Sequence, residues 1–72
     1  MFIVIELQTT DGQTANIVTA YTDKADADEK FHQIMAAAAK SSVGIHAAVI
    51  MDETGMSIRQ EAYRHSGKVE EQ

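Results

Sequence analysis

Two hairpin-like halves flank one alanine-rich segment, and each half contains a strand that is apolar at consecutive positions. Phe2–Ile5 and Ala47–Met51 are these two runs. Consecutive apolar residues on a strand point to both faces of a sheet, so both faces need cover. A single helix can cover one face only. The remaining face therefore needs another partner, and we expect a second copy of the chain.

The first half predicts a hairpin whose register is open. Phe2–Thr9 is rich in β-branched residues, Asp11-Gly12 is a strong turn signal, and Thr14–Tyr21 forms the returning strand. A two-residue loop pairs Ile5 with Val18, whereas a three-residue loop pairs Ile5 with Ile17, and the two choices place different side chains on each face.

We favour the longer loop, because it gathers one apolar set beneath the helix: Ile3, Ile5, Leu7, Ala15 and Ile17. The opposite face then shows four residues that we predict as the dimer interface: Phe2, Val4, Val18 and Ala20. A contiguous apolar patch of this kind typically marks an interface.

The middle of the chain predicts one amphipathic helix. Thr22 or Asp23 can cap its start, and it runs to about Lys40 or Ser41. Its sheet-facing stripe follows helical spacing: Ala27, Phe31, Ile34, Met35 and Ala38.

The second half predicts another hairpin and a short tail. Ile45–Asp52 and Met56–Tyr63 are its strands, joined by a Glu53-Thr54-Gly55 turn with glycine in the left-handed position. Residues 1–65 therefore form one ββαββ domain, and the polar residues 66–72 are expected to be a flexible tail.

Connectivity predicts the strand order. The helix returns the chain so that the third strand runs parallel to the second, which lets it pair antiparallel with the first. The resulting α+β fold is a four-stranded antiparallel sheet of order 2-1-3-4 with one helix on one face. This order puts the two apolar runs in the centre.

Charge and composition exclude several classes of function. The chain has a net charge of −5, no cysteine and no proline. Scattered basic residues argue against binding nucleic acid through its phosphates, and the absence of cysteine excludes disulfides and thiolate zinc sites. The apolar run at the start is too short for a secretory or membrane segment, so we expect a cytoplasmic protein without a membrane partner.

The candidate site residues are polar and lie mainly on the last strand. Arg59, Glu61 and Tyr63 alternate along one face, and His65 extends the row. His32 and His46 are the other histidines, but no close-spaced pair predicts a metal site. No cysteine nucleophile, phosphate loop or serine elbow is present, so we expect neither an enzyme nor a cofactor.

Three segments carry a resemblance: Lys30–Ala39, Ile45–Val49 and Ile58–His65. Their pattern resembles a family of small uncharacterised proteins encoded in bacteriophages and prophages of gut Firmicutes, over nearly the whole chain to His65. The resemblance implies a phage origin, and no function is carried over from it. The six polar positions that match it are His32, His46, Arg59, Glu61, Tyr63 and His65.

These observations lead to two hypotheses of function. The first is a non-enzymatic homodimeric module that binds a phage or host protein in the host cytoplasm. The alternative is a protein that binds or sequesters a small ligand, such as a nucleotide or metabolite, at the dimer interface. Arg59, Tyr63, His46 and His65 would line that site, with arginine pairing an anion and tyrosine stacking.

Overall fold

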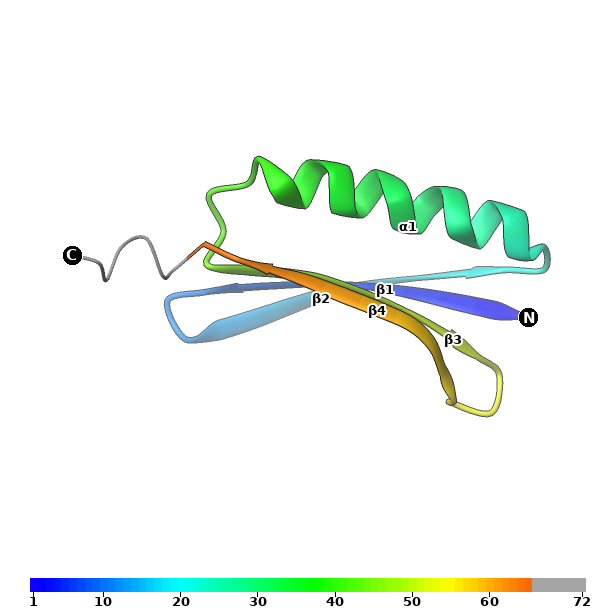
Figure 1. Cartoon of the computed structure of the whole chain (residues 1–72). Coiled ribbons are helices and arrows are strands. Elements are labelled where there is room, and N and C mark those ends of the chain that lie inside the picture. Colours follow the sequence, from blue (N-terminus) through cyan, green and yellow to red (C-terminus); the bar gives the residue numbers. More distant parts are fainter. Residues whose placement is uncertain (66–72) are drawn as a thin grey trace.

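The chain forms one antiparallel sheet with one helix lying along it (Figure 1). The computed structural model describes residues 1–65, so the predicted tail at 66–72 lies outside the described part. The elements in chain order are β1 (Phe2–Thr10), β2 (Gln13–Tyr21), α1 (Lys24–Ala39), β3 (Ile45–Asp52) and β4 (Ser57–Arg64).

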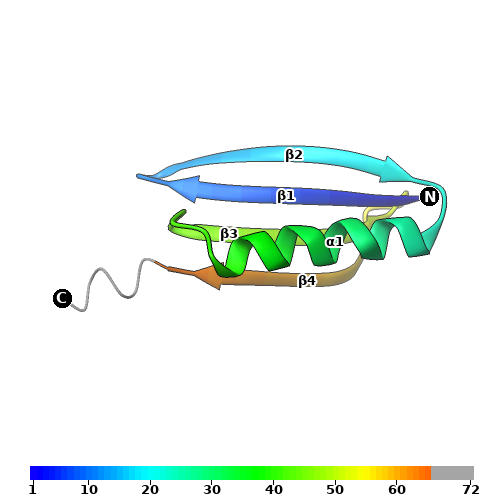
Figure 2. The same ribbon diagram turned by 90° about the horizontal axis from the view of Figure 1, so that it is seen from above.

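The strand order is β2-β1-β3-β4, with every neighbouring pair antiparallel, as predicted. Figure 2 shows the helix running along the β3 and β4 side of the sheet, while β2 is the strand farthest from it. The two apolar runs occupy the central strands β1 and β3. One face of the sheet is therefore covered by the helix, chiefly at its centre and on the β4 side.

The predicted register of the first hairpin is wrong by one residue. Asp11 and Gly12 both adopt positive φ, of 54° and 80°. Positive φ at both central positions is the geometry of a two-residue type I′ turn, which aspartate tolerates and glycine favours. Ile5 consequently pairs with Val18 rather than Ile17.

This shift exchanges the two faces of β1. Val4 is 1% exposed and belongs to the core under the helix, and Phe2 packs against the same core. Both residues were predicted at the dimer interface, and they lie on the other face because each strand position alternates between faces. Val18 and Ala20 do lie on the face away from the helix, now together with Ile3, Ile5 and Leu7.

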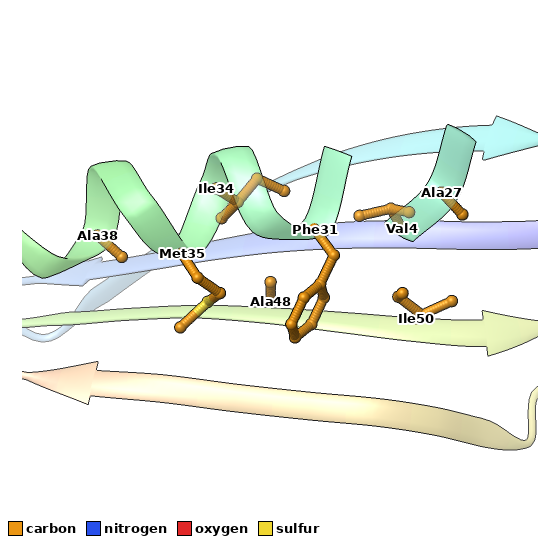
Figure 3. Close-up of a cluster of buried hydrophobic side chains, with 8 residues drawn as sticks. All are labelled: Val4, Ala27, Phe31, Ile34, Met35, Ala38, Ala48 and Ile50. Carbon is orange, nitrogen blue, oxygen red and sulfur yellow. The ribbon is translucent and has the colours of Figure 1, made fainter. Parts of the chain in front are cut away.

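The core has a helix half and a sheet half (Figure 3). The helix contributes the five predicted residues of its stripe, which confirms that prediction: Ala27, Phe31, Ile34, Met35 and Ala38. The sheet contributes Val4, Ala48 and Ile50. Alanines on both sides let the helix approach closely, and Phe31, at 0% exposure, supplies the largest buried side chain.

The turn between β3 and β4 is held by the side chain of Asp52. The Asp52 carboxylate accepts hydrogen bonds from the Thr54 N–H, the Thr54 hydroxyl and the Met56 N–H. These bonds hold the pKa of Asp52 below its ordinary value. Gly55 takes a φ of 89°, which confirms the predicted left-handed glycine.

Candidate functional site

A histidine–glutamate pair lies between the central strands on the helix side. His46 Nε2 is 2.7 Å from Glu6 Oε2, and their side chains are 6% and 15% exposed. The pairing of Glu6 with Ala48 and of Gln8 with His46 places the two side chains diagonally across the β1–β3 ladder. This pair is the principal polar group beneath the helix.

Hydrogen bonding sets the ionisation of Glu6. Burial by itself raises the pKa of this carboxyl, but hydrogen bonds from His46 and Gln8, together with the charges of His46 and Lys30, outweigh burial and lower it. The Gln8 amide donates to Glu6 Oε2 at 2.9 Å. Glu6 is therefore an acceptor held in place by two donors.

The second ring nitrogen of His46 lacks a partner in the described part of the chain. Nδ1 is buried and has no hydrogen-bond partner within residues 1–65. Nε2 carries the proton shared with the Glu6 carboxylate, so Glu6 is the one hydrogen-bond partner of this ring within the described residues. Loss of either partner would leave a buried polar atom without its hydrogen bond, so the pair has a structural role in joining β1 to β3.

Tyr63 and His65 continue from this pair to the end of the sheet. Tyr63 pairs with His46 across β3 and β4. The Tyr63 and His65 rings stack with centroids 6.0 Å apart and planes 6° apart. His65 Nε2 donates to the Ala38 carbonyl at 2.7 Å. This carbonyl also accepts from the Ser41 N–H, and the bond from His65 joins the last turn of α1 to the end of β4.

Arg59 and Glu61 form a separate group farther along β4. The Arg59 guanidinium lies 4.7 Å from the centroid of the Phe31 ring. Arg59 also donates to Glu61 Oε2 at 3.3 Å, and both side chains are about half exposed. Arg59 thus covers the edge of the core through a cation–π contact rather than pointing at an empty anion site.

The sixth predicted residue, His32, stands apart from both groups. It lies exposed on the helix and meets Phe31 edge to face at 6.2 Å. The structure therefore divides the predicted residues into a row of His46, Tyr63 and His65, a pair of Arg59 and Glu61, and His32. Among residues 1–65, no three histidine, aspartate or glutamate side chains converge to hold a metal ion.

Glu6 and Gln8 are site residues that the sequence reasoning missed. Glu6 is the single charge in the β1 segment Phe2–Thr10, a strand predicted to be central. A buried charge needs a partner, so this interruption was the available signal. Its partner His46 could be identified only once the sheet pairing was known.

The larger candidate surface is the sheet face turned away from the helix, which we call the open face. It comprises the residues that alternate with those under the helix: Ile3, Ile5, Leu7, Thr9, Thr14, Asn16, Val18, Ala20, Ile45, Ala47, Val49, Met51, Ile58, Gln60, Ala62 and Arg64. Arg64 is the one ionisable residue among them. No described element covers this face (Figure 1).

A shallow depression of about 300 Å³ opens on this face. Its lining consists of Ala47, Ala48, Val49, Gln60, Glu61 and Ala62, so Glu61 is the one predicted site residue that borders it. Ala47 and Ala62 are cross-strand partners, so two small side chains meet there and leave the hollow. Arg59, Tyr63 and His46 alternate with these positions and lie on the helix side. These three predicted ligand residues and the depression are therefore on opposite faces of the sheet.

Comparison with known proteins adds no relative: no family model, curated protein or solved structure matches the chain. Within residues 1–65, the helix is neither long nor apolar enough to cross a membrane.

Proposed function

We propose that this chain is a non-enzymatic, homodimeric interaction module of phage or prophage type, which associates through its open face and binds a phage or host protein. The observation that carries the proposal is an apolar sheet face with no cover from the described chain. Exposed apolar patches of a few hundred Å² are commonly functional surfaces.

The size of the open face suits an interface. Four strands about 4.8 Å apart, with eight residues at about 3.3 Å each, span roughly 500 Å² in projection. Accessible area exceeds projected area because side chains make the surface uneven. A standard interface buries about 800 Å² per partner, so the face supports a dimer of ordinary or slightly smaller size.

Charge favours a second copy as the occupant. Each chain carries a net charge of −5, and the open face contributes no acidic residue to it. Two copies can therefore meet there without bringing carboxylates together, while their acidic residues stay elsewhere. A twofold pairing of one face with itself is the commonest arrangement of homodimers, and it would give two stacked sheets with a shared apolar layer.

The small size of the core is a second reason to propose a dimer. The core under the helix consists of eight buried hydrophobic residues, three of which are alanine. A domain of this size gains limited stability from one core, and oligomerisation is a common supplement. Burial of the open face would add that second core.

Sedimentation equilibrium over a wide concentration range tests the dimer, with Val49→Lys as the disrupting variant. Val49 lies at the centre of the open face, between Ile5 and Gln60. Burying an unpaired charge there should weaken dimerisation by about a hundredfold or more. Ile17→Lys is the matched control, because Ile17 is 55% exposed on the other face.

A wild-type chain that remains monomeric at high micromolar concentration would contradict the proposal. Equal effects of Val49→Lys and Ile17→Lys would also contradict it, because they would show that the open face has no special role. Far-UV circular dichroism checks that each variant keeps its fold.

The depression around Ala47 and Ala62 supports a second candidate, a small-ligand site enclosed at the dimer interface. Its volume is at the lower end of the range for ligand pockets, and its lining favours an apolar ligand rather than a nucleotide. Ala62→Leu should fill the hollow and abolish any ligand-induced rise in melting temperature. An unchanged thermal shift in that variant would remove this candidate.

A further inference from the structure

The edge strand β2 lacks the features that normally prevent an edge from pairing. Its sequence, QTANIVTAY, has no charged residue and no proline. Its ladder with β1 runs without a bulge from Phe2↔Tyr21 to Thr10↔Gln13. Charges, prolines and bulges are the usual protections of an edge strand, so β2 presents nine residues of regular, unprotected backbone.

The opposite edge of the same sheet is protected. β4 carries Arg59, Glu61 and Arg64. Its ladder with β3 contains a register irregularity between Ile50 and Met51. The contrast shows that protection is specific to one edge, and that the open edge is the one farthest from the helix (Figure 2).

The turn geometry identifies which backbone groups are free. In a two-residue hairpin the pair that closes the turn is hydrogen-bonded, and bonded and non-bonded pairs then alternate. Thr10↔Gln13 closes this turn, so the Leu7↔Asn16 pair is non-bonded. The N–H and C=O of Asn16 therefore point away from β1, toward the free edge.

Acidic residues bracket this neutral edge. Asp11 precedes β2 in the turn, and Asp23 follows it at the start of the helix, where its side chain makes no capping hydrogen bond. The nearby Lys24 pairs with Asp28 at 3.0 Å. A strand laid along β2 therefore meets a negative charge at each end and none between.

This charge pattern disfavours a second copy of β2 as the occupant. An antiparallel twofold pairing centred on Ile17 uses the full strand and places Asp11 of each copy opposite Asp23 of the other. Like charges directly opposite each other destabilise a sheet. A strand with basic residues at its ends has the complementary pattern.

We propose that the β2 edge binds an extended segment of a partner protein by strand addition, and that this segment has an uncharged centre and basic residues at both ends. Backbone hydrogen bonds would give affinity, and the flanking charges would select the partner. The inference rests on the proposed function in assuming a protein partner, but it does not require the dimer.

Fluorescence anisotropy with two peptides tests the proposal. Both have alternating threonine and valine over the length of β2; one carries two lysines at each end and the other two glutamates. The lysine peptide should bind about tenfold or more tightly than the glutamate peptide, with the difference reduced at high salt. Asn16→Pro should weaken binding about tenfold or more because it removes an outward N–H, whereas Asn16→Thr should stay within about twofold.

Several outcomes would overturn the proposal. These are equal binding of the two peptides, absence of binding by both, unchanged binding by Asn16→Pro, or conversion of a dimer to a monomer by Asn16→Pro but not by Asn16→Thr. If that variant fails to fold, a lysine peptide N-methylated at alternate positions provides the test, and its undiminished binding would refute strand addition. Binding that persists in Val49→Lys separates this edge from the open face.

Discussion

The His46–Glu6 pair predicts strong coupling between two residues forty positions apart. We consider His46→Leu, Glu6→Leu and the double variant, all on the helix side of the sheet. Each single substitution leaves one polar group without its principal partner in a site where the side chains are 6% and 15% exposed. The double substitution removes both polar groups and adds apolar surface beneath the helix.

The magnitudes follow from these partners. Loss of His46 leaves the Glu6 carboxylate with Gln8 as its remaining hydrogen-bond donor, and should cost about 2–3 kcal/mol of unfolding free energy. Loss of Glu6 leaves a buried ring N–H without an acceptor and should cost about 1–3 kcal/mol. The double variant should lie within about 1 kcal/mol of wild type, because apolar replacement of a buried pair is often neutral or stabilising.

The pH dependence has a defined sign. The pKa of Glu6 in the folded chain is below its ordinary value of 4.5. Ionised Glu6 therefore contributes stability above about pH 4.5, and that contribution is lost as pH falls through the folded-state pKa. The cost of His46→Leu should shrink over the same acid range. Asp52 and Glu53, whose pKa values are also lowered, retain their contribution in all four proteins.

Urea unfolding at one fixed protein concentration measures the four free energies, since self-association makes apparent stability concentration-dependent. A chain of this length has about 4–11 kcal/mol of stability, so the single variants remain folded enough to measure. We expect a coupling energy of about 2 kcal/mol or more. Additive costs, or a His46→Leu penalty that grows on acidification, would refute the reasoning.

Two further predictions concern the core and the first turn. Phe31→Ala should lower the free energy of unfolding by about 3–5 kcal/mol, because Phe31 is fully buried and also contacts Arg59. Phe31→Leu should lower it clearly less, and urea unfolding measures both. Equal losses would show that the ring fills no critical volume. Gly12→Ala should lower the free energy of unfolding by about 1 kcal/mol because Gly12 has a φ of 80°. Ala20→Gly, within a strand of the same hairpin, measures for comparison the cost of placing a glycine in a strand. A stabilised Gly12→Ala would contradict the type I′ turn.

The fold could be predicted from sequence because its signals are long-range regularities. The stripe from Ala27 to Ala38 repeats at helical spacing, and all five of its residues are buried. The strand order follows from connectivity together with the two apolar runs, Phe2–Ile5 and Ala47–Met51. Each of these inferences stays the same if an element boundary or a strand register is shifted by one residue.

The faces of β1 could not be predicted in the same way. They depend on whether the loop after Thr10 contains two or three residues. The two-residue loop requires a positive φ at Asp11, which is 54° in the structure, and no pattern in the sequence specifies that conformation. One residue reverses every side chain in a strand. The wrong register placed Val4 on the face away from the helix and Ile5 beneath the helix. It also placed Glu6 on the face away from the helix, so nothing in the sequence indicated that Glu6 pairs with His46.

The structure also shows how one strand can serve two surfaces without conflict. Val18 and Ala20 point their side chains to the open face, while Asn16 points its backbone groups along the plane of the sheet, toward the free edge. Stacking two sheets would occupy the first direction and leave the second accessible. The proposed dimer would therefore carry two β2 edges related by its twofold axis, and a partner with two suitable segments could occupy both. Linking two binding events raises overall affinity without a new contact, so dimerisation would strengthen capture of a bivalent partner while leaving the affinity of each edge unchanged.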